Sequence, residues 1–190
     1  MKIKLITLLL TTSTFISLPS TATQVDEWDN RVSFLLGYKN LKSSAFEEDA
    51  QKATGIELDI KRKSWPVSIA IDLLGSGEST SVHNGKVQEV TGGVHIGARK
   101  HWMLTDNIET YIGGGLNYEI AEIKNTVNGV STKIDDNRVG VWFSAGMNWK
   151  FNNGLILGGE LRHTNEIDYY NNGTIQTGGL YSGVTLGYSF

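Results

Sequence analysis

The sequence predicts an all-β protein: an eight-stranded, antiparallel, up-and-down transmembrane β-barrel with a polar, filled interior. Three observations lead to this fold class. Apolar side chains alternate with polar or small ones from residue 31 to the C-terminus, polar turns divide this region into eight segments, and glycine is concentrated on the polar face. Alternation places successive side chains on opposite faces of a strand. The length of 190 residues suits one such domain.

Residues 1–22 are predicted to be a secretory signal peptide, which leaves 23–190 as the barrel domain. Lys2 and Lys4 give the segment a positive start, an apolar stretch follows from residue 5, and Ser20-Thr21-Ala22 supplies small residues for a cleavage site. A short buried helix is the alternative interpretation of this segment. No other run approaches the ~18 apolar residues that a membrane-spanning helix needs.

Alternation is clearest over residues 137–151, where the odd positions from Val139 to Phe151 are all apolar and the even positions are mostly polar or small. A strand of this kind has two unlike faces, whereas a helix would scatter both sets around its circumference. The same pattern predicts eight strands, at about 31–40, 53–61, 65–75, 89–103, 108–123, 137–151, 154–165 and 175–190.

The connections between these strands alternate in length. Short polar turns are expected near 61–64, 105–107 and 152–154, and longer polar loops near 41–52, 76–88, 124–136 and 166–174. In an up-and-down sheet, three short turns and four long loops put both chain ends on the short-turn side.

Alternation alone does not decide which face of the barrel points outward, and a soluble barrel would turn the apolar face inward. Glycine favours the membrane-spanning alternative, because the narrow interior of an eight-stranded barrel must mix small and large residues. The tryptophans favour it too. Trp28, Trp65, Trp102 and Trp149 share the short-turn end and the apolar face, as expected for rings at a membrane interface. Phe190, the last residue, is assigned to the same interfacial set.

The predicted inward face carries charge. Buried charges persist when they are paired and hydrogen-bonded, so a ladder of salt bridges across the lumen is expected, for example between Glu119 and Arg138 or Arg99. Such a lumen leaves no room for a general solute channel. The predicted interior network comprises Lys39, Glu57, Asp59, Asp72, His95, Arg99, Glu119, Arg138, Glu160 and Arg162.

Several kinds of site are excluded or disfavoured by composition. The absence of cysteine excludes disulfides, thiolate zinc sites and a cysteine nucleophile. The formal charge of −3 disfavours a nucleic-acid partner, which usually needs a clustered basic surface. His95 and His101 share a face, but the rise of a strand separates them by roughly 20 Å, too far to hold one metal ion. No catalytic residue, cofactor or metal is expected.

The C-terminal residues carry a resemblance to a known family. Val184, Leu186, Tyr188 and Phe190 alternate with small residues, and the chain ends on an aromatic ring. This pattern resembles the C-terminal targeting strand of bacterial outer-membrane barrels. With the leader and the eight strands, the whole mature chain resembles the small barrels of the OmpA, OmpX and opacity-protein group.

The resemblance implies a protein of the outer membrane of a Gram-negative-type bacterium. It implies recognition of the last strand, ending at Phe190, by the barrel-assembly machinery. Outer-membrane lipid and lipopolysaccharide are the expected partners, and a monomer is the expected state. The expected role is non-enzymatic: envelope structure, or surface interaction through four long extracellular loops, because loops on a rigid scaffold commonly carry function.

Two other functions remain open at this point. Lipid A deacylases are also eight-stranded barrels, with a His-x-Ser motif in the penultimate strand. Here the corresponding residues are His163-Thr164-Asn165. Asn165 cannot be an acyl nucleophile, and the position of Thr164 in the alternation points its side chain into the lumen. Both observations weaken the hypothesis of a deacylase-like enzyme acting on lipid A or phospholipid. The other alternative is a narrow gated pore, which requires the charged lumen to rearrange.

Overall fold

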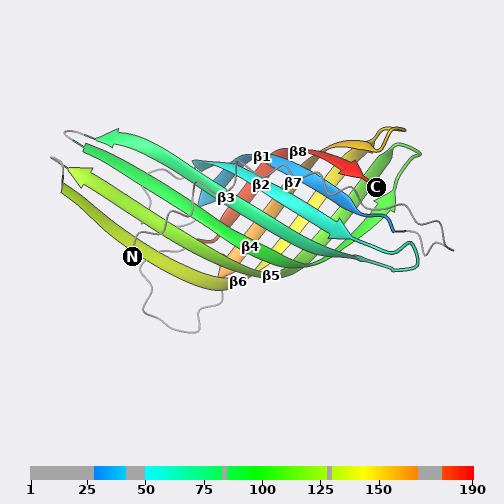
Figure 1. The fold of residues 1–190 in the computed structure, drawn as a ribbon, viewed down its shortest axis with the longest axis horizontal. Coiled ribbons are helices and arrows are strands. Elements are labelled where there is room, and N and C mark those ends of the chain that lie inside the picture. The colour runs from blue at the N-terminus through cyan, green and yellow to red at the C-terminus, as the bar shows by residue number, and fades with distance from the viewer. Residues whose placement is uncertain (1–27, 42–49, 83–84, 128–129, 167–176) are drawn as a thin grey trace, which may run out of the picture.

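The structure is a computed structural model that describes residues 28–41, 50–82, 85–127, 130–166 and 177–190. In these residues eight antiparallel strands pair in chain order, and β8 pairs with β1 to close a barrel (Figure 1). The predicted fold class is confirmed, whereas the predicted signal peptide lies outside the described residues. The strands are β1 (Arg31–Leu41), β2 (Ala50–Ile60), β3 (Ser68–Val82), β4 (Gly85–Met103), β5 (Ile108–Val127), β6 (Val130–Lys150), β7 (Leu155–Glu166) and β8 (Gly179–Ser189).

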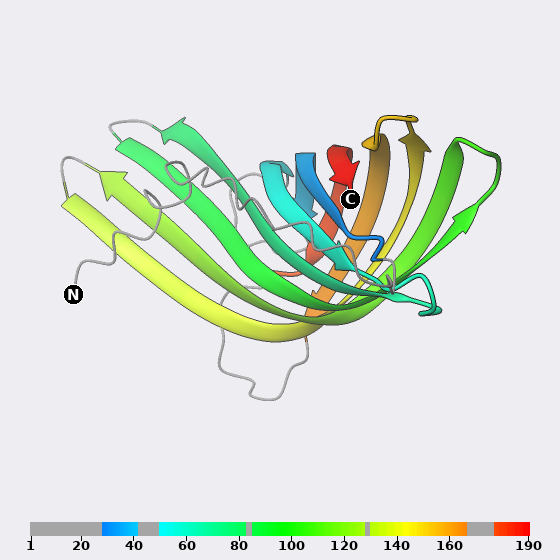
Figure 2. The same cartoon turned by 45° about the vertical axis from the view of Figure 1, so that its right-hand side comes forward.

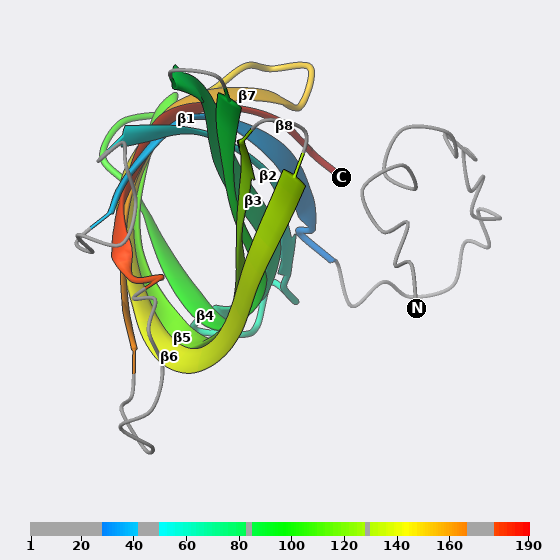
Figure 3. The ribbon, with the colours of Figure 1, turned by 90° about the vertical axis from the view of Figure 1, so that its left-hand side faces the viewer.

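Closure depends on the pairing of the first and last strands, and the resulting ring is visible in Figure 3. β1 and β8 pair from Arg31↔Ser189 to Leu41↔Gly179. Just outside this register, Asn30 and Phe190 exchange two backbone hydrogen bonds of 2.9 Å. A closed sheet has no unpaired edge, and hydrocarbon offers no partners for backbone groups, so closure is the condition for a sheet to stand in lipid.

The short turns lie where they were expected. β4 and β5 are joined by a turn in which the Leu104 amide donates to the Ile108 carbonyl at 2.8 Å. The β6–β7 turn contains Gly154 at a φ of 86°, a left-handed conformation that glycine adopts without steric cost. Across the described residues no helix is long and apolar enough to cross a membrane.

Two of the four predicted long loops are wrong. Residues 76–88 and 124–136 belong mostly to strands: β3 and β4 pair as far as Val82↔Gly85, and β5 and β6 as far as Val127↔Val130. The apolar alternation fades in these segments because side chains beyond the lipid have no reason to be apolar, yet the backbone ladder continues. The predicted loops 41–52 and 166–174 lie largely outside the described residues, although β2 already begins at Ala50.

The strands on one side of the barrel are therefore much longer than those on the other side. β4, β5 and β6 have 19, 20 and 21 residues, against 11 in β1, β2 and β8. The outer parts of β3, β4, β5 and β6 extend well past the other strands at the end opposite the short turns (Figure 2). We call this four-stranded extension the outer sheet. On β5 and β6 it comprises about residues 120–127 and 130–137, which pair with each other beyond the last β6–β7 pair, Gly140↔Glu166.

Large apolar side chains cover the outer surface of the barrel. Leu116 and Phe143 are 60% and 62% exposed, although each lies in the middle of a long strand. Trp142, the neighbour of Phe143 on the opposite face, is fully buried in the lumen. Large apolar surface is expected where lipid replaces water, so the outward direction predicted for the apolar face agrees with the structure.

Leu116→Arg is expected to destabilise the barrel by about 2–4 kcal/mol in a bilayer, because it puts a cation near the middle of the apolar band. The matched change Leu104→Arg is expected to cost about 0–1 kcal/mol, because Leu104 lies in the exposed β4–β5 turn near the interface. Urea unfolding in phospholipid vesicles, followed by heat-modifiable gel migration, measures both. Equal costs at the two positions would contradict a lipid-facing Leu116.

Candidate functional site

The centre of the lumen is occupied by ion pairs around two arginines. Arg162 on β7 donates to Glu57 on β2 at 2.7 Å and to Glu160 on its own strand at 2.7 Å, and its Nη1 lies 2.8 Å from Asp72 on β3. The guanidinium group is fully buried and lies 4.7 Å from the ring centroid of Trp142. One side chain thus joins strands on opposite walls of the barrel.

Arg99 on β4 is the second arginine of this cluster. It donates to Asp72 at 2.6 Å, to Asp59 at 3.0 Å and to Glu57 at 3.4 Å. Four carboxylates therefore share two guanidinium groups. The lumen cluster is defined as Glu57, Asp59, Asp72, Arg99, Glu160 and Arg162, all buried. Buried pairs of this density act as a rigid cross-link, because separating any one of them would leave a desolvated charge.

A second group of polar residues lies nearer the outer end of the lumen. Lys39 on β1 donates to Glu119 on β5 at 2.8 Å, and its ammonium nitrogen lies 4.7 Å from the ring centroid of Tyr181. His95 Nε2 lies 3.4 Å from the same Glu119 carboxylate. The expected pairing of Glu119 with Arg138 or Arg99 is wrong, because Lys39 reaches it from across the lumen. Arg138 instead donates to Asp136, two residues away on β6, at 3.0 Å.

A third group, at the short-turn end, was absent from the predicted network. Arg31 on β1 makes a two-point contact with Glu109 on β5, in which Nη2 donates to Oε2 at 2.8 Å. His101 lies 3.1 Å from Glu109 and 3.3 Å from Asp59, which links this group to the lumen cluster. The alternation of side chains could have predicted this group, because each member lies an even number of residues from a predicted inward residue on its own strand. Arg31 shares its face with Lys39, Glu109 with Glu119, and His101 with Arg99.

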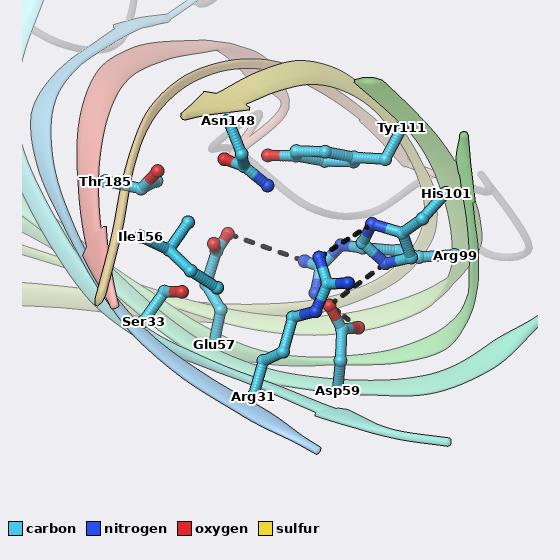
Figure 4. Close-up of a pocket in the computed structure, with 10 residues that line it drawn as sticks. All are labelled: Arg31, Ser33, Glu57, Asp59, Arg99, His101, Tyr111, Asn148, Ile156 and Thr185. Atoms are coloured by element: carbon cyan, nitrogen blue, oxygen red, sulfur yellow. Dashed lines mark hydrogen bonds and ion pairs between the residues drawn. The ribbon is translucent and has the colours of Figure 1, made fainter. Parts of the chain in front are cut away.

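Little space is left between the second arginine and the short-turn group. A cavity of about 10 Å³ lies there, enough for roughly one water molecule (Figure 4). Its lining includes Arg31, Glu57, Asp59, Arg99, His101 and Tyr111. The lumen at this level is filled by side chains.

Nine of the ten residues predicted for the interior network are buried in the lumen, and Arg138 is half-buried at the outer end. Of the predicted interfacial aromatics, Trp28, Trp102, Trp149 and Phe190 are exposed. Trp65 is half-buried against Trp28, at 6.1 Å between ring centroids. All five lie at or next to the short-turn end of the barrel, since Trp28 bridges to Arg62 and Trp149 pairs with Ile108.

The candidate deacylase residues are not arranged as nucleophile and base. Thr164 is buried in the lumen and accepts a hydrogen bond from the Gly179 amide at 3.1 Å. His163 is on the opposite face of β7, where its neighbours across the sheet are Phe143 and Leu180. Among the described residues, no group of three or more His, Cys, Asp or Glu side chains could hold a metal ion.

A closed eight-stranded antiparallel barrel with an apolar outer face and an ion-paired lumen defines a class, the small transmembrane β-barrels. Residues 7–190 match the family model described as the outer membrane protein beta-barrel domain, and the chain belongs to this family. Membership places the protein in the bacterial outer membrane.

Several solved structures share this fold. The chain superposes on Ail, the attachment invasion locus protein of Yersinia pestis, with a TM-score of 0.61 and 8% identity, over 86% of this chain and 99% of Ail. A major outer membrane protein of Thermus thermophilus gives 0.62 and 8%, over 86% and 99%. Neisserial surface protein A gives 0.55 and 11%, over 86% and 97%. None of the curated proteins compared with the chain matches its sequence.

Proposed function

We propose that the protein is a non-enzymatic surface-interaction protein, in which the filled barrel is an anchor and the outer sheet binds partners outside the cell. The single observation that carries the proposal is the unequal length of the strands around a cross-linked lumen. Outer-membrane barrels have short periplasmic turns, so the outer sheet lies on the extracellular side. From the sequence, four long loops were expected to bind partners. Here the outer sheet and the loops beside it form the proposed binding surface.

Exposed apolar side chains on the outer sheet support this role. Val127, Val130 and Ile134 are 41%, 71% and 49% exposed and lie on the face that continues the lumen side of β5 and β6. They lie beyond the lipid-facing band, so lipid does not account for their exposure. Contiguous apolar surface in water commonly marks an interaction site. One structure of Ail is a complex with the heparin analogue sucrose octasulfate, so a barrel of this fold can bind a sulfated sugar.

Shortening the β5–β6 hairpin tests the proposal. Deletion of residues 125–127 and 130–132 keeps the register, because these segments pair with each other, and it joins Lys124 and Lys133 through Asn128-Gly129. Intact bacteria that carry the full-length protein are expected to attach to an immobilised ligand, tested first with heparin, more than cells lacking it. The shortened variant is expected to lose this increment. Unchanged attachment in the shortened variant would reject the outer sheet as the binding element.

Two further measurements test the non-enzymatic anchor. The acylation state of lipid A is expected to be the same in cells with and without the protein, since neither His163 nor Thr164 is placed for acyl transfer. In planar bilayers, the purified protein is expected to give no stable conductance steps, because the lumen cluster crosses the barrel. A protein-dependent loss of acyl chains or steady unit conductance would favour the enzyme or the gated pore.

Export, assembly and the monomeric state belong to the proposed function. Residues 1–22 are removed on passage to the periplasm, the strand that ends at Phe190 is recognised by the assembly machinery, and the barrel works as a monomer among outer-membrane lipids. Mass spectrometry of the protein from outer membranes tests the first point directly, because cleavage after Ala22 leaves Thr23 as the first residue.

A further inference from the structure

A row of lysines crosses the lipid side of the outer sheet. Lys124 on β5 and Lys133 on β6 are directly opposite each other in the strand register. Lys86 on β4 is opposite Thr126 and is therefore diagonal to Lys124. All three side chains are exposed. Residues opposite each other on one face have Cβ atoms about 5 Å apart and diagonal ones about 7–8 Å apart, so the three ammonium groups can converge on one anion. We call Lys86, Lys124 and Lys133 the lysine row.

The row keeps a net positive charge, because three lysines face two nearby carboxylates, Glu122 and Asp135. Lys133 makes an ion pair of 3.1 Å with Glu122, which raises the pKa of the Lys133 ammonium through their hydrogen bond. Lys86 and Lys124 form no ion pair with any residue in the described segments. Asp135, the other nearby carboxylate, is opposite Glu122, one row closer to the membrane. Like charges placed opposite each other destabilise a sheet. An anion bound between Lys124 and Lys133 would therefore reduce the repulsion between their two ammonium groups.

Neutral hydrogen-bond donors surround the lysines on the same face. Thr126 and Ser131 lie one row farther out and share a hydrogen bond of 2.9 Å between their hydroxyl groups. Gln88 on β4 is opposite Lys124, and Ser79 on β3 is opposite Gln88. Ammonium, hydroxyl and amide groups are donors that suit the oxygen atoms of a phosphate.

The height of the row matches the outer-leaflet headgroups. On the same face of β5, the apolar band ends with Tyr118 and Ile120, which are exposed. Lys124 is four residues farther along the strand. With a rise of ~3.3 Å per residue and a strand tilt of ~40°, it lies roughly 10 Å above Ile120. Lysine side chains bend toward an interface, which brings their ammonium groups to the level of lipid phosphates.

We propose that the lysine row binds a phosphate group carried by the headgroup of an outer-leaflet glycolipid, with Lys124 and Lys133 as the main ligands and Lys86 as the third. The site is on the convex, lipid side of the outer sheet, whereas Val127, Val130 and Ile134 are on the opposite face. The inference therefore adds a lipid site that does not depend on the proposed binding of extracellular partners. A phosphate at this height is reached without lifting the lipid from its leaflet.

Lipid binding by the full-length protein in detergent, counted by native mass spectrometry, tests the proposal. The probes are lipid A with its phosphates and the same lipid after enzymatic dephosphorylation. Wild-type protein is expected to prefer the phosphorylated lipid, and Lys124→Gln/Lys133→Gln is expected to weaken its binding about tenfold, which corresponds to about 1.4 kcal/mol. Lys124→Arg/Lys133→Arg is expected to retain binding, because guanidinium groups also bind phosphate.

Lys100→Gln is the matched control, because Lys100 is also exposed on the lipid side but lies beside Trp102 at the short-turn end. This change is expected to leave lipid binding unaltered. Heat-modifiable gel migration shows whether each variant folds, and the exposed lysines have no part in the lumen cluster. Equal binding of phosphorylated and dephosphorylated lipid A by the wild type, or wild-type binding by the double Gln variant, overturns the proposal.

Free glucosamine 1-phosphate identifies the source of the phosphate. If millimolar sugar phosphate does not displace lipid A, the lysine row binds a phosphate on a membrane lipid, as proposed. If it displaces lipid A fully, the lysine row still binds phosphate, but its ligand is a soluble phosphorylated sugar and the proposed lipid ligand is wrong. The shortened β5–β6 hairpin retains Lys124 and Lys133. The attachment assay and the lipid-binding assay therefore test different residues, and either proposal can be rejected while the other is retained.

Discussion

Arg162→Met is expected to lower the free energy of unfolding by about 3–5 kcal/mol, the largest loss among the variants considered. Arg162 contacts Glu57, Asp72 and Glu160, and none of these carboxylates is exposed. Methionine fills part of the volume but leaves the carboxylates with Arg99 as their remaining arginine. Removing one partner of a buried pair costs more than the pair contributes, because the charge left behind stays desolvated.

Urea unfolding in phospholipid vesicles, monitored by tryptophan fluorescence and gel migration, measures this loss. Lys52→Gln is the control, because its ion pair with Glu78 is exposed and such pairs contribute little. Arg162→Met/Glu160→Gln is expected to recover part of the loss, since it removes one of the unpaired charges. A loss below about 1 kcal/mol for Arg162→Met would show that water compensates the lumen charges and that the cluster is not a cross-link.

Gly97→Ala is expected to destabilise the barrel by about 3 kcal/mol and to slow its closure. Gly97 on β4 and Gly115 on β5 are opposite each other on the inner face. A Cβ atom on Gly97 would overlap the Gly114 carbonyl oxygen and lie 2.8 Å from the Gly115 Cα. Both contacts are with backbone, so the strands themselves would have to separate.

Gly159→Ala provides the comparison at a glycine on the outer face of β7. The nearest atom to its added Cβ is the Gly183 carbonyl oxygen, at 3.6 Å, an ordinary contact. This change is expected to alter the free energy of unfolding by less than about 1 kcal/mol, and it can be stabilising because alanine restricts the unfolded chain. The same urea titration measures both variants. Similar effects at Gly97 and Gly159 would contradict the assignment of Gly97 to a crowded inner face.

Alternation of side chains predicted the strands and their faces because lipid imposes it. Where lipid ends, the constraint ends as well, and the outer parts of β3 to β6 were therefore mistaken for loops. Ile123 and Ile134 pair directly across β5 and β6, but two apolar residues among polar ones do not establish a period. The short-turn end was easier to predict, because polar turns there interrupt strands that are apolar on one face.

The partners inside the lumen could not be predicted from the sequence. Parity tells which side chains point inward, and it correctly grouped Glu57, Asp72 and Arg162. It does not tell which of them meet, because several of the contacts run across the barrel between strands that are not neighbours. Lys39 reaches Glu119, 80 residues away, and Arg162 reaches Glu57, 105 residues away. Those distances depend on barrel radius and strand stagger, which appear only when the sheet closes.

The contact between Arg162 and Glu57 has a consequence for folding. A nascent barrel that has inserted β2, β3 and β4 already carries Glu57, Asp59 and Asp72 with Arg99 as the only arginine of the lumen cluster, and the compensating cation arrives with β7. Partial insertion therefore leaves Glu57 and Asp72 without one of their two arginine partners. Completion brings Arg162 together with Glu160 on the same strand, so the missing ion pairs form while the net charge of the lumen cluster stays the same. Such long-range contacts make folding slow and cooperative. They also make a barrel that has not yet inserted its last two strands less stable than the complete one.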